Sequence, residues 1–322
     1  MLQVIPLEAI ERVLPQIDVV GLMEEGFVAY SEGRAMVPPV GELVFEDPPG
    51  ETHIKYGYIR GGDHYVIKIA SGFYGNADLG LPSGGGLMLL LSQKTGFLEA
   101  ILLDEGHLTD VRTAAAGAVA AKHLAPSEVR RIGILGGGVQ ARLQLELLQP
   151  LTSCREVLVW MRDPAKFEPY VDSFSDSDLV IELAASSEEV PDRCNLIVTT
   201  TPARTPLIAA ERVRPGTHIT AIGSDTADKI ELAPEILGNA DLVVVDSLSQ
   251  SEARGEVFRA VDAGALSRET VVELGAVVAG HAPGRVDDNQ VTICDLTGVA
   301  VQDLMIAQGV RAGAAPESRH ES

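Results

Sequence analysis

Cysteine and aromatic residues are scarce in this chain of 322 residues. It has three cysteines, and aromatic residues make up 4% of the sequence. Cys154, Cys194 and Cys294 are odd in number and never stand in C-x-x-C spacing, so they indicate neither a disulfide framework nor a cysteine zinc site. We therefore expect a reducing compartment and no bound metal.

Positive charge is also in short supply. Lysine and arginine number 25 against 46 aspartates and glutamates, which gives a formal net charge of −21. A nucleic acid or an anionic membrane would repel such a chain, so neither is an expected partner. No apolar run reaches the length that spans a bilayer, and the N-terminus has no basic segment followed by an apolar core. These absences predict a cytoplasmic protein whose charge serves solubility.

Apolar residues and glycine are abundant instead. Hydrophobic residues make up 46% of the chain and glycine contributes 32 residues, a composition that suits an α/β enzyme. A single core rarely grows beyond about 250 to 300 residues, so this length predicts two domains.

The clearest local pattern is the stretch RIGILGGGVQAR at residues 131–142. A buried strand is predicted over 131–135, a glycine turn follows it, and a helical pattern begins after the turn. Gly136, Gly138 and Ala141 fit G-x-G-x-x-G/A, in which backbone approaches a pyrophosphate at a helix N-terminus. Glycine turns also close ordinary αβ units, so the motif alone is weak. A second strand at the βαβ distance favours a dinucleotide site.

Strand signals differ on the two sides of residue 131. Before it, short segments recur about every ten residues with turn residues between them, which is typical of an antiparallel sheet. After it, strands alternate with helices, which predicts a doubly wound parallel sheet. The antiparallel segments are expected at 42–45, 53–59, 65–69, 86–91 and 96–103. The parallel strands are expected at 131–135, 157–161, 195–199, 217–221, 242–245 and 291–295, with a weaker signal at 180–183.

Helical patterns complete the predicted α/β fold. Two helices fit residues 7–30, a closing helix fits 299–310, and an alanine-rich helix fits 106–125 with Thr109 or Asp110 as its N-cap. We predict a Rossmann domain over residues 125–297. Residues 1–124 and 298–322 together form the predicted discontinuous α+β domain.

Four motifs in combination resemble the ornithine cyclodeaminase and mu-crystallin family. They are GLPS at 80–83 preceded by Asn76, LLDEGHLTDVRTAAA around Arg112, the GGGVQA turn, and GSDTADKIEL around Asp225. The resemblance spans nearly the whole chain. It implies a homodimeric enzyme that uses NAD or NADP on the C–N bond of an amino acid or its imine, with the discontinuous domain serving dimerisation and substrate binding. Members include cyclodeaminases, alanine dehydrogenases and imino-acid or ketimine reductases.

Two cations are the expected anchors of a substrate carboxylate. Lys68 stands on a strand face that the pattern YVIKIA predicts to be buried, where a lysine is costly to desolvate unless an anion meets it. A solvated strand edge is the alternative. Arg112 opens the alanine-rich helix, where a cation opposes the helix dipole, and its planar fork can bind the same carboxylate with two hydrogen bonds. With the resemblance, both residues are predicted to be substrate-binding and catalytic.

Asp225 is the expected proton-transfer group. It follows directly on a predicted parallel strand, at the sheet edge where α/β proteins bind ligands. A carboxylate there can hold an ammonium or iminium group and move a proton to or from its nitrogen while the nicotinamide carries the hydride. An N-cap of a following helix is the alternative. Lys229, one helical turn on, would keep Asp225 ionised or simply pair with it.

The end of the second Rossmann strand bears on the choice between NAD and NADP. An NAD-selective site usually places an acid there, whereas this strand ends in Met161 and Arg162, with Asp163 just beyond. Arg162 would pair with a 2′-phosphate, as a similar arginine does in the NADP-using members that this chain resembles. An exposed Arg162 paired with Asp163 or Glu168 is the alternative, and we expect NADPH to be at least tolerated. The other predicted cofactor-binding residues are Asn76, Gly136, Gly138, Val139, Gln140, Thr200, Thr201, Gly223, Lys229 and Val299.

The chain departs from the family at two places. Cyclodeaminases carry an arginine after the paired prolines, where this chain has Val40, and their Asp-Cys-Pro-Gly-Lys run reads Asp-Thr-Ala-Asp-Lys here. With Lys68 and Arg112 kept, and His53 or Lys55 added, a rearranged pocket for a small imino acid is favoured over ornithine. Spare cations would also serve a dicarboxylic imino acid such as iminosuccinate. Ornithine cyclodeaminase and a non-catalytic dinucleotide-binding protein stay open as alternatives.

Overall fold

The computed structural model describes residues 2–314, with the backbone alone described at residues 74 and 77. Contacts divide the chain into two compact units. Unit 1 holds residues 1–112 and 299–322, and unit 2 holds residues 113–298; of the expected C-terminal segment, residues 315–322 lie outside the described part. The first division falls inside α3 (His107–Leu124), whose C-terminal end was the expected boundary.

Unit 1 is built on a seven-stranded sheet in the order β1-β7-β6-β5-β4-β2, with β3 paired to β4. The pairs are antiparallel, as expected, except that β1 runs parallel to β7. The sequence pattern does not predict β1, because its four residues are too few to show alternation. The strands are β1 (Gln3–Pro6), β2 (Ala35–Met36), β3 (Gly41–Glu46), β4 (Pro49–Ile59), β5 (His64–Phe73), β6 (Gly84–Ser92) and β7 (Leu98–Leu103).

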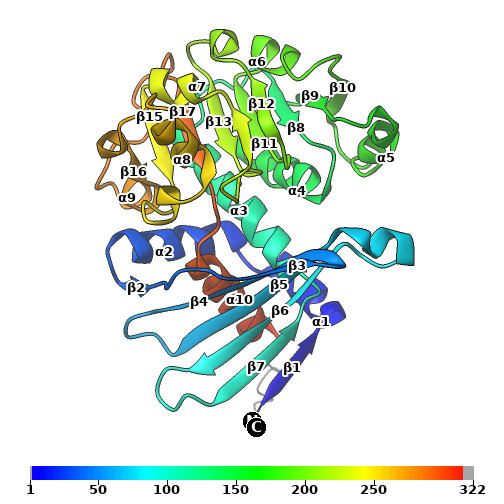
Figure 1. Cartoon of the computed structure of the whole chain (residues 1–322), viewed down its shortest axis with the longest axis vertical. Coiled ribbons are helices and arrows are strands. Elements are labelled where there is room, and N and C mark those ends of the chain that lie inside the picture. The colour runs from blue at the N-terminus through cyan, green and yellow to red at the C-terminus, as the bar shows by residue number, and fades with distance from the viewer. Residues whose placement is uncertain (1, 315–322) are drawn as a thin grey trace, which may run out of the picture. The chain divides into compact units, whose positions relative to one another are not determined.

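One face of this sheet is covered by the C-terminal helix α10 (Ala300–Gly313), which packs on β4, β5, β6 and α2 (Figure 1). Gly57 of β4 allows this approach, since a Cβ there would lie 2.7 Å from the carbonyl oxygen of Met36 and 3.5 Å from the Cβ of Ala300. No described helix is both long and apolar enough to cross a bilayer. The other helices of unit 1 are α1 (Leu7–Val13) and α2 (Val19–Ser31), with short 3-10 turns at Leu14–Gln16 and Tyr74–Leu79.

Unit 2 is a doubly wound domain on an eight-stranded parallel sheet in the order β10-β9-β8-β11-β13-β17-β15-β16, so the predicted α/β fold class is confirmed. Short apolar runs such as IGIL and LVVV form its buried central strands, as parallel sheets covered on both faces require. The strands are β8 (Ile132–Leu135), β9 (Glu156–Trp160), β10 (Val180–Leu183), β11 (Leu196–Thr199), β13 (His218–Ala221), β15 (Leu242–Val245), β16 (Val272–Glu273) and β17 (Thr292–Asp295).

A second, two-stranded parallel sheet joins β12 (Arg204–Ile208) to β14 (Ile230–Leu232). The sequence pattern does not predict this pair, because both strands are short and follow loops that carry polar residues. The helices of unit 2, besides α3, are α4 (Val139–Leu148), α5 (Phe167–Asp172), α6 (Glu189–Arg193), α7 (Pro234–Asn239), α8 (Gly255–Asp262) and α9 (Leu274–Val278).

The N-cap predicted for α3 at Thr109 or Asp110 is wrong. The helix begins earlier, at His107, and the carboxylate of Asp104 accepts a hydrogen bond from the backbone N–H of Leu108 at 3.0 Å. The turn before it needs a left-handed backbone, which Gly106 supplies at φ 92°. The Asp-Glu-Gly run was therefore the true start signal of this helix.

Candidate functional site

A pocket of about 520 Å³ opens in unit 2. It lies beyond the carboxyl ends of β8, β9 and β11, where the strand order of the sheet changes direction, and open α/β sheets bind ligands at such a switch point. Its walls are residues 136–138, residues 160–163 with Lys166, and residues 200–205 with Leu207.

The glycine turn forms the floor of this pocket. Gly136 has φ 138°, and a Cβ there would lie 2.1 Å from Oγ1 of Thr200, so the first glycine packs against the end of β11. A Cβ on Gly138 would meet no atom within 4 Å, so its backbone faces open space at the N-terminus of α4. Free N–H groups and the helix dipole make this end a site for a phosphate, which fits a dinucleotide. Val139 and Gln140 form the first helical residues behind it.

Cations stand at the second wall of the pocket. Arg162 is exposed and lines it, and no ion pair with Asp163 or Glu168 is formed among the described side chains. The carboxylate of Asp163 instead caps the next turn, accepting from the N–H of Ala165 at 3.1 Å. Arg204, from the third wall, pairs with the exposed Asp228 at 2.8 Å.

Asp225 lies in a loop after β13, and the alternative of an N-cap is wrong because no helix follows it. The chain runs instead through residues 224–229 into β14. Lys229 Nζ lies 2.5 Å from Oδ1 of Asp225, so the expected pair exists without the expected helical turn. The hydroxyl of Ser224 donates to the carbonyl of Lys229 at 2.8 Å and closes the loop. The Asp225 side chain is half exposed, at 50%.

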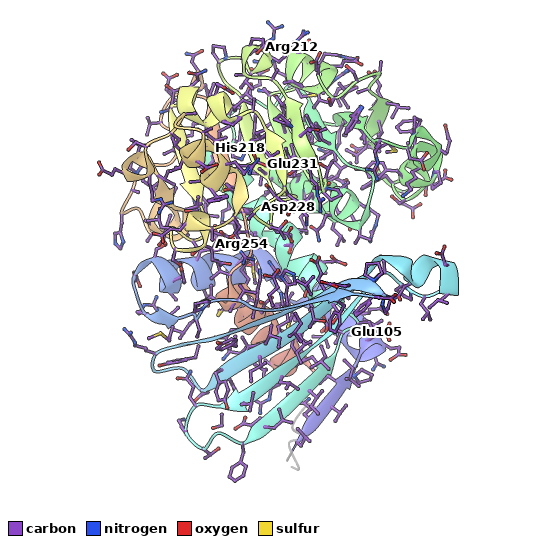
Figure 2. All side chains as sticks on the ribbon, viewed as in Figure 1. Glu105, Arg212, His218, Asp228, Glu231 and Arg254 are labelled. Atoms are coloured by element: carbon purple, nitrogen blue, oxygen red, sulfur yellow. The ribbon has the colours of Figure 1, made fainter. Side chains whose placement is uncertain are left out.

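Glu231, which the sequence pattern did not indicate, is fully buried in the middle of β14. Figure 2 labels it in unit 2. Its Oε1 accepts from the N–H and the hydroxyl of Thr201 at 2.6 and 2.7 Å. Its Oε2 accepts from the hydroxyl of Thr199 at 2.7 Å and from the N–H of Gly223 at 2.8 Å. A glutamate inside the apolar run IEL was the signal that could have found it.

Unit 1 contains a buried group of charges, here called the cation cluster: Lys55, Lys68 and Arg112 around Asp303. Lys55 and Lys68 are directly opposite each other on β4 and β5. Lys68 Nζ lies 3.1 Å and Arg112 Nε 3.0 Å from the same Oδ1 of Asp303, a residue of α10. The three cations are 9%, 2% and 5% exposed, and Asp303 is fully buried. Lys68 is therefore on a buried face, and the solvated edge is excluded.

Burial and neighbouring charge shift the pKa values in the cation cluster. Burial first, and then the charge of Arg112, lowers the pKa of Lys68 to about 7, although Asp303 opposes this. Burial alone would raise the pKa of Asp303, but Lys68 and Arg112 bring it below its ordinary value. Asp303 thus stays ionised beside cations that it only partly neutralises. The sequence analysis overlooked it because a single acid in a helix gives no periodic signal.

Three other predicted residues lie elsewhere in unit 1. His53 stands between two acids, with Nε2 at 3.5 Å from Glu42 and 3.6 Å from Glu51. Asn76 donates to the carbonyl of Pro82 at 2.8 Å and holds its own loop together. Val299 is the N-cap position of α10.

A family model described as the ornithine cyclodeaminase/mu-crystallin family matches residues 3–317 of this chain. An uncharacterized cyclodeaminase of Sinorhizobium fredii is 42% identical over 308 residues, which cover 95% of this chain and 91% of that protein. An archaeal alanine dehydrogenase, described as a dimer with bound NAD, has a TM-score of 0.89 at 36% identity and 97% and 95% coverage. The iminosuccinate reductase of Paracoccus denitrificans in complex with NAD+ has a TM-score of 0.90 at 30% identity and 97% and 96% coverage.

Proposed function

Because the chain belongs to the ornithine cyclodeaminase/mu-crystallin family, we propose that it is an NAD(P)-dependent oxidoreductase that reduces a small imino acid to an L-amino acid, or catalyses the reverse. The observation that carries this proposal is the cation cluster of unit 1. Buried cations are costly unless anions meet them, and the three cations Lys55, Lys68 and Arg112 outnumber the two buried acids, Asp303 and Asp104, that interact with them. A substrate carboxylate would add a further anion.

Lys68 and Arg112 bind that carboxylate in this proposal, and Asp225 handles the proton on the substrate nitrogen. The guanidinium fork of Arg112 matches a carboxylate with two hydrogen bonds, whereas Lys68 contributes a point charge. Asp225 is half exposed and its carboxylate pairs with Lys229, and a carboxylate in that place can accept a proton from an ammonium group. A bound dinucleotide would supply or accept the hydride.

The dinucleotide is proposed to bind along the pocket of unit 2. Gly136 and Gly138 meet its pyrophosphate, with Val139 and Gln140 at the helix start, and Thr200 and Thr201 form the opposite wall. Arg162 would meet a 2′-phosphate, since this cation follows the strand end and the acid just beyond it, Asp163, caps the next turn through its Oδ1. We therefore propose that NADPH is accepted as well as NADH.

A dicarboxylic imino acid is the substrate that the cation cluster favours. Lys55 gives the cluster a second ammonium group directly opposite Lys68, so a second carboxylate of the substrate would also meet a positive charge. Asp104, whose pKa burial raises, is the other acid that interacts with Lys68. His53 is left out of the substrate site because its nearest charges, Glu42 and Glu51, would repel a carboxylate.

Ornithine is disfavoured by the same charges. Its second ammonium group would enter a cluster that already holds three cations. Cyclodeaminase activity stays the alternative because a relative carries that name, and a dinucleotide-binding protein without turnover is the other. A protein that only binds the dinucleotide would not need a proton-transfer group such as Asp225. We therefore propose an enzyme and not a binding protein.

The test is a screen of purified protein with NADH and NADPH against 2-oxo acids plus ammonia. We expect oxaloacetate, which forms iminosuccinate with ammonia, to be turned over with a higher kcat/KM than pyruvate. Lys55→Met should reduce this preference at least tenfold, because only the dicarboxylate uses that ammonium group. Lys94→Met is the matched control, since Lys94 is exposed and pairs with Asp63. Equal use of both acids by the wild type, or release of ammonia from ornithine, would contradict the dicarboxylate assignment.

We also propose a homodimer formed through the face of the unit 1 sheet that α10 does not cover. Large apolar side chains are exposed on that face, which is the usual sign of a protein interface. Phe45→Glu should therefore shift the mass in solution from two chains to one, as measured by light scattering, whereas Phe97→Glu, in a loop, should not. The side chains are Val4, Leu43, Phe45, Tyr56 and Leu103.

A further inference from the structure

The buried carboxylate of Glu231 joins two segments that leave the parallel sheet at neighbouring strands. After β11 the chain continues through Thr200 and Thr201 toward β12, and after β13 it continues through the Asp225 loop toward β14. Glu231 reaches back from β14 and accepts hydrogen bonds from both segments. Figure 2 labels Glu231 within unit 2, together with Asp228 of the loop before it.

The donors around Glu231 suit its ionised form. Each carboxylate oxygen accepts one backbone N–H and one hydroxyl, and only the carboxylate can accept all four hydrogen bonds at once. Burial raises the pKa of Glu231, and the hydrogen bonds from Thr199, Thr201 and Gly223 act against that rise. A buried carboxylate whose lone pairs are all satisfied is stable in place and rigid.

The two segments that Glu231 joins are also closely packed. A Cβ on Gly223 would lie 2.0 Å from the carbonyl oxygen of Thr201, and Thr200 packs against Gly136 of the dinucleotide turn. Thr200 and Thr201 line the pocket, and Asp225 is two residues beyond Gly223. A movement at Glu231 would therefore displace both the pocket wall and the loop that carries the acid.

We propose that Glu231 is a positioning residue: it sets the wall formed by Thr200 and Thr201 against the bound dinucleotide and fixes the loop that carries Asp225. The proposal rests on the proposed function, because it takes the unit 2 pocket as the dinucleotide site. Glu256 supports it from behind, since its carboxylate accepts from the N–H groups of Glu231 and Leu232 at 2.7 and 3.2 Å and so holds the backbone of β14.

Glu231→Gln is the variant that tests this role. An amide has one oxygen and one NH2 group, so in either orientation a backbone N–H, of Thr201 or of Gly223, faces another donor. The hydroxyls of Thr199 and Thr201 can rotate, but the backbone N–H groups cannot. A lost hydrogen bond to a buried charged group corresponds to about tenfold to a hundredfold in an equilibrium. We expect the NADH dissociation constant of the folded variant to rise by about that factor.

The measurement is an NADH fluorescence titration on purified wild type and variants, together with a thermal unfolding curve for each. Glu235→Gln is the matched control, because it makes the same chemical change on an exposed residue of α7 and should bind NADH as the wild type does. Thr199→Val removes one hydroxyl donor without touching the pocket lining, so it should weaken NADH binding a few-fold. It decides the question if Glu231→Gln does not fold.

A role in stability alone predicts a different result. Glu231→Gln would then unfold at a lower temperature but, while folded, bind NADH with wild-type affinity, and this outcome would overturn the proposal. The titration uses no imino acid, so it does not depend on the substrate. A wild type that binds neither NADH nor NADPH would overturn both the positioning role and the proposed function, whereas a wild type that binds and a variant that binds equally would overturn the positioning role only.

Discussion

The two units use buried charge in opposite ways. Unit 1 buries Lys55, Lys68 and Arg112 beside the acids Asp303 and Asp104, whereas unit 2 buries carboxylates such as Glu231 and Glu256 and satisfies them with N–H and hydroxyl donors. Buried cations thus outnumber buried acids in the cation cluster of unit 1, and in unit 2 both oxygens of Glu231 and of Glu256 accept hydrogen bonds. The first arrangement suits the capture of an anion, and the second suits a fixed scaffold.

The pKa values show the same contrast. Burial lowers the pKa of Lys68 to about 7 in unit 1, and in unit 2 it raises the pKa of Glu256 to about 8 and that of Asp295 to about 7. Burial penalises the charged form in both units. In the proposed function a carboxylate ligand relieves the penalty only in unit 1, so substitutions there should act on substrate affinity, and substitutions in unit 2 on the dinucleotide and on turnover.

Asp225→Asn should have the largest effect of any single change in unit 2. The asparagine amide keeps the size of the side chain but cannot accept the proton, and proton-transfer groups contribute about 10²- to 10⁴-fold to rate. We expect kcat to fall by that factor while NADH binding stays near wild type. Steady-state kinetics with the best substrate of the screen, and an NADH titration, measure the two quantities.

Asp228→Asn is the control for this variant, because Asp228 lies in the same loop but pairs with the exposed Arg204. It should retain most of the wild-type kcat. If Asp225→Asn turned over normally, the Asp225 pair with Lys229 would be only a structural contact of the loop.

Arg112→Lys should have the next largest effect, and it should fall on the substrate alone. The replacement keeps a positive charge but loses the fork that binds a carboxylate with two hydrogen bonds. We expect KM for the imino acid to rise about tenfold to a hundredfold, which corresponds to about 1.4 to 2.7 kcal/mol, with an unchanged NADH dissociation constant. An equal loss of NADH affinity would mean that Arg112 acts on dinucleotide binding. The two units would then not differ in which ligand their buried charges affect.

The sequence predicted unit 2 better than unit 1 for a physical reason. Alternation of strands and helices, and the turn that contains Gly136 and Gly138, are local patterns, and the structure has them where they were expected. The family inferred from the motifs is confirmed. The parallel partner of β7 and the β12–β14 pair were missed, because these strands are too short to show a pattern in the sequence.

The candidate site divides in the same way. Lys68 and Arg112 were found because a cation on a predicted buried face, or at a predicted helix start, is itself unusual. The expected place of Arg112 at the start of its helix is wrong, since α3 begins at His107. Asp303 and Glu231 were missed, since each is a single acid whose role depends on residues that are distant in the sequence. Asp303 contacts Lys68 and Arg112. Glu231 accepts hydrogen bonds from the segments that follow two neighbouring strands. Sequence patterns show where a buried charge would cost free energy, but they do not show which groups form its ion pairs and hydrogen bonds.

Arg162→Ala tests the dinucleotide pocket of unit 2, where the loss of one exposed contact should change binding less than the loss of a buried charge in unit 1. Arg162 lines the pocket and has no ion-pair partner among the described residues. Its removal should weaken NADPH binding about tenfold and NADH binding by much less, because only NADPH carries the 2′-phosphate. Titrations with both dinucleotides measure this. A wild type that prefers NADH more than about a hundredfold, roughly 2.7 kcal/mol, would mean that an acid reaches the ribose.

The smallest predicted effect is a pH dependence that should appear at the substrate site and not at the dinucleotide site. With a pKa of about 7 in place of 10.5, Lys68 is charged below pH 7 and neutral above it, so the cation cluster loses a charge as the pH rises. A carboxylate ligand prefers the charged form, and the inhibition constant of succinate should therefore rise several-fold between pH 6 and pH 8.5. Asp303 stays ionised throughout, because its pKa is lowered.

Lys68→Met is the control for this pH dependence, since it should bind succinate weakly at both pH values with a flat profile. The linkage has a second consequence with a definite sign. Between pH 7 and pH 10.5 the unfolded chain keeps the Lys68 proton that the folded chain releases, so this residue makes the free energy of unfolding increase with pH across that window. Comparing the unfolding free energies of wild type and Lys68→Met at pH 7 and pH 9 measures it. A wild type whose succinate affinity and relative stability are both flat would show that Lys68 keeps its proton in the cluster, and that Asp303 alone neutralises enough of the positive charge in unit 1.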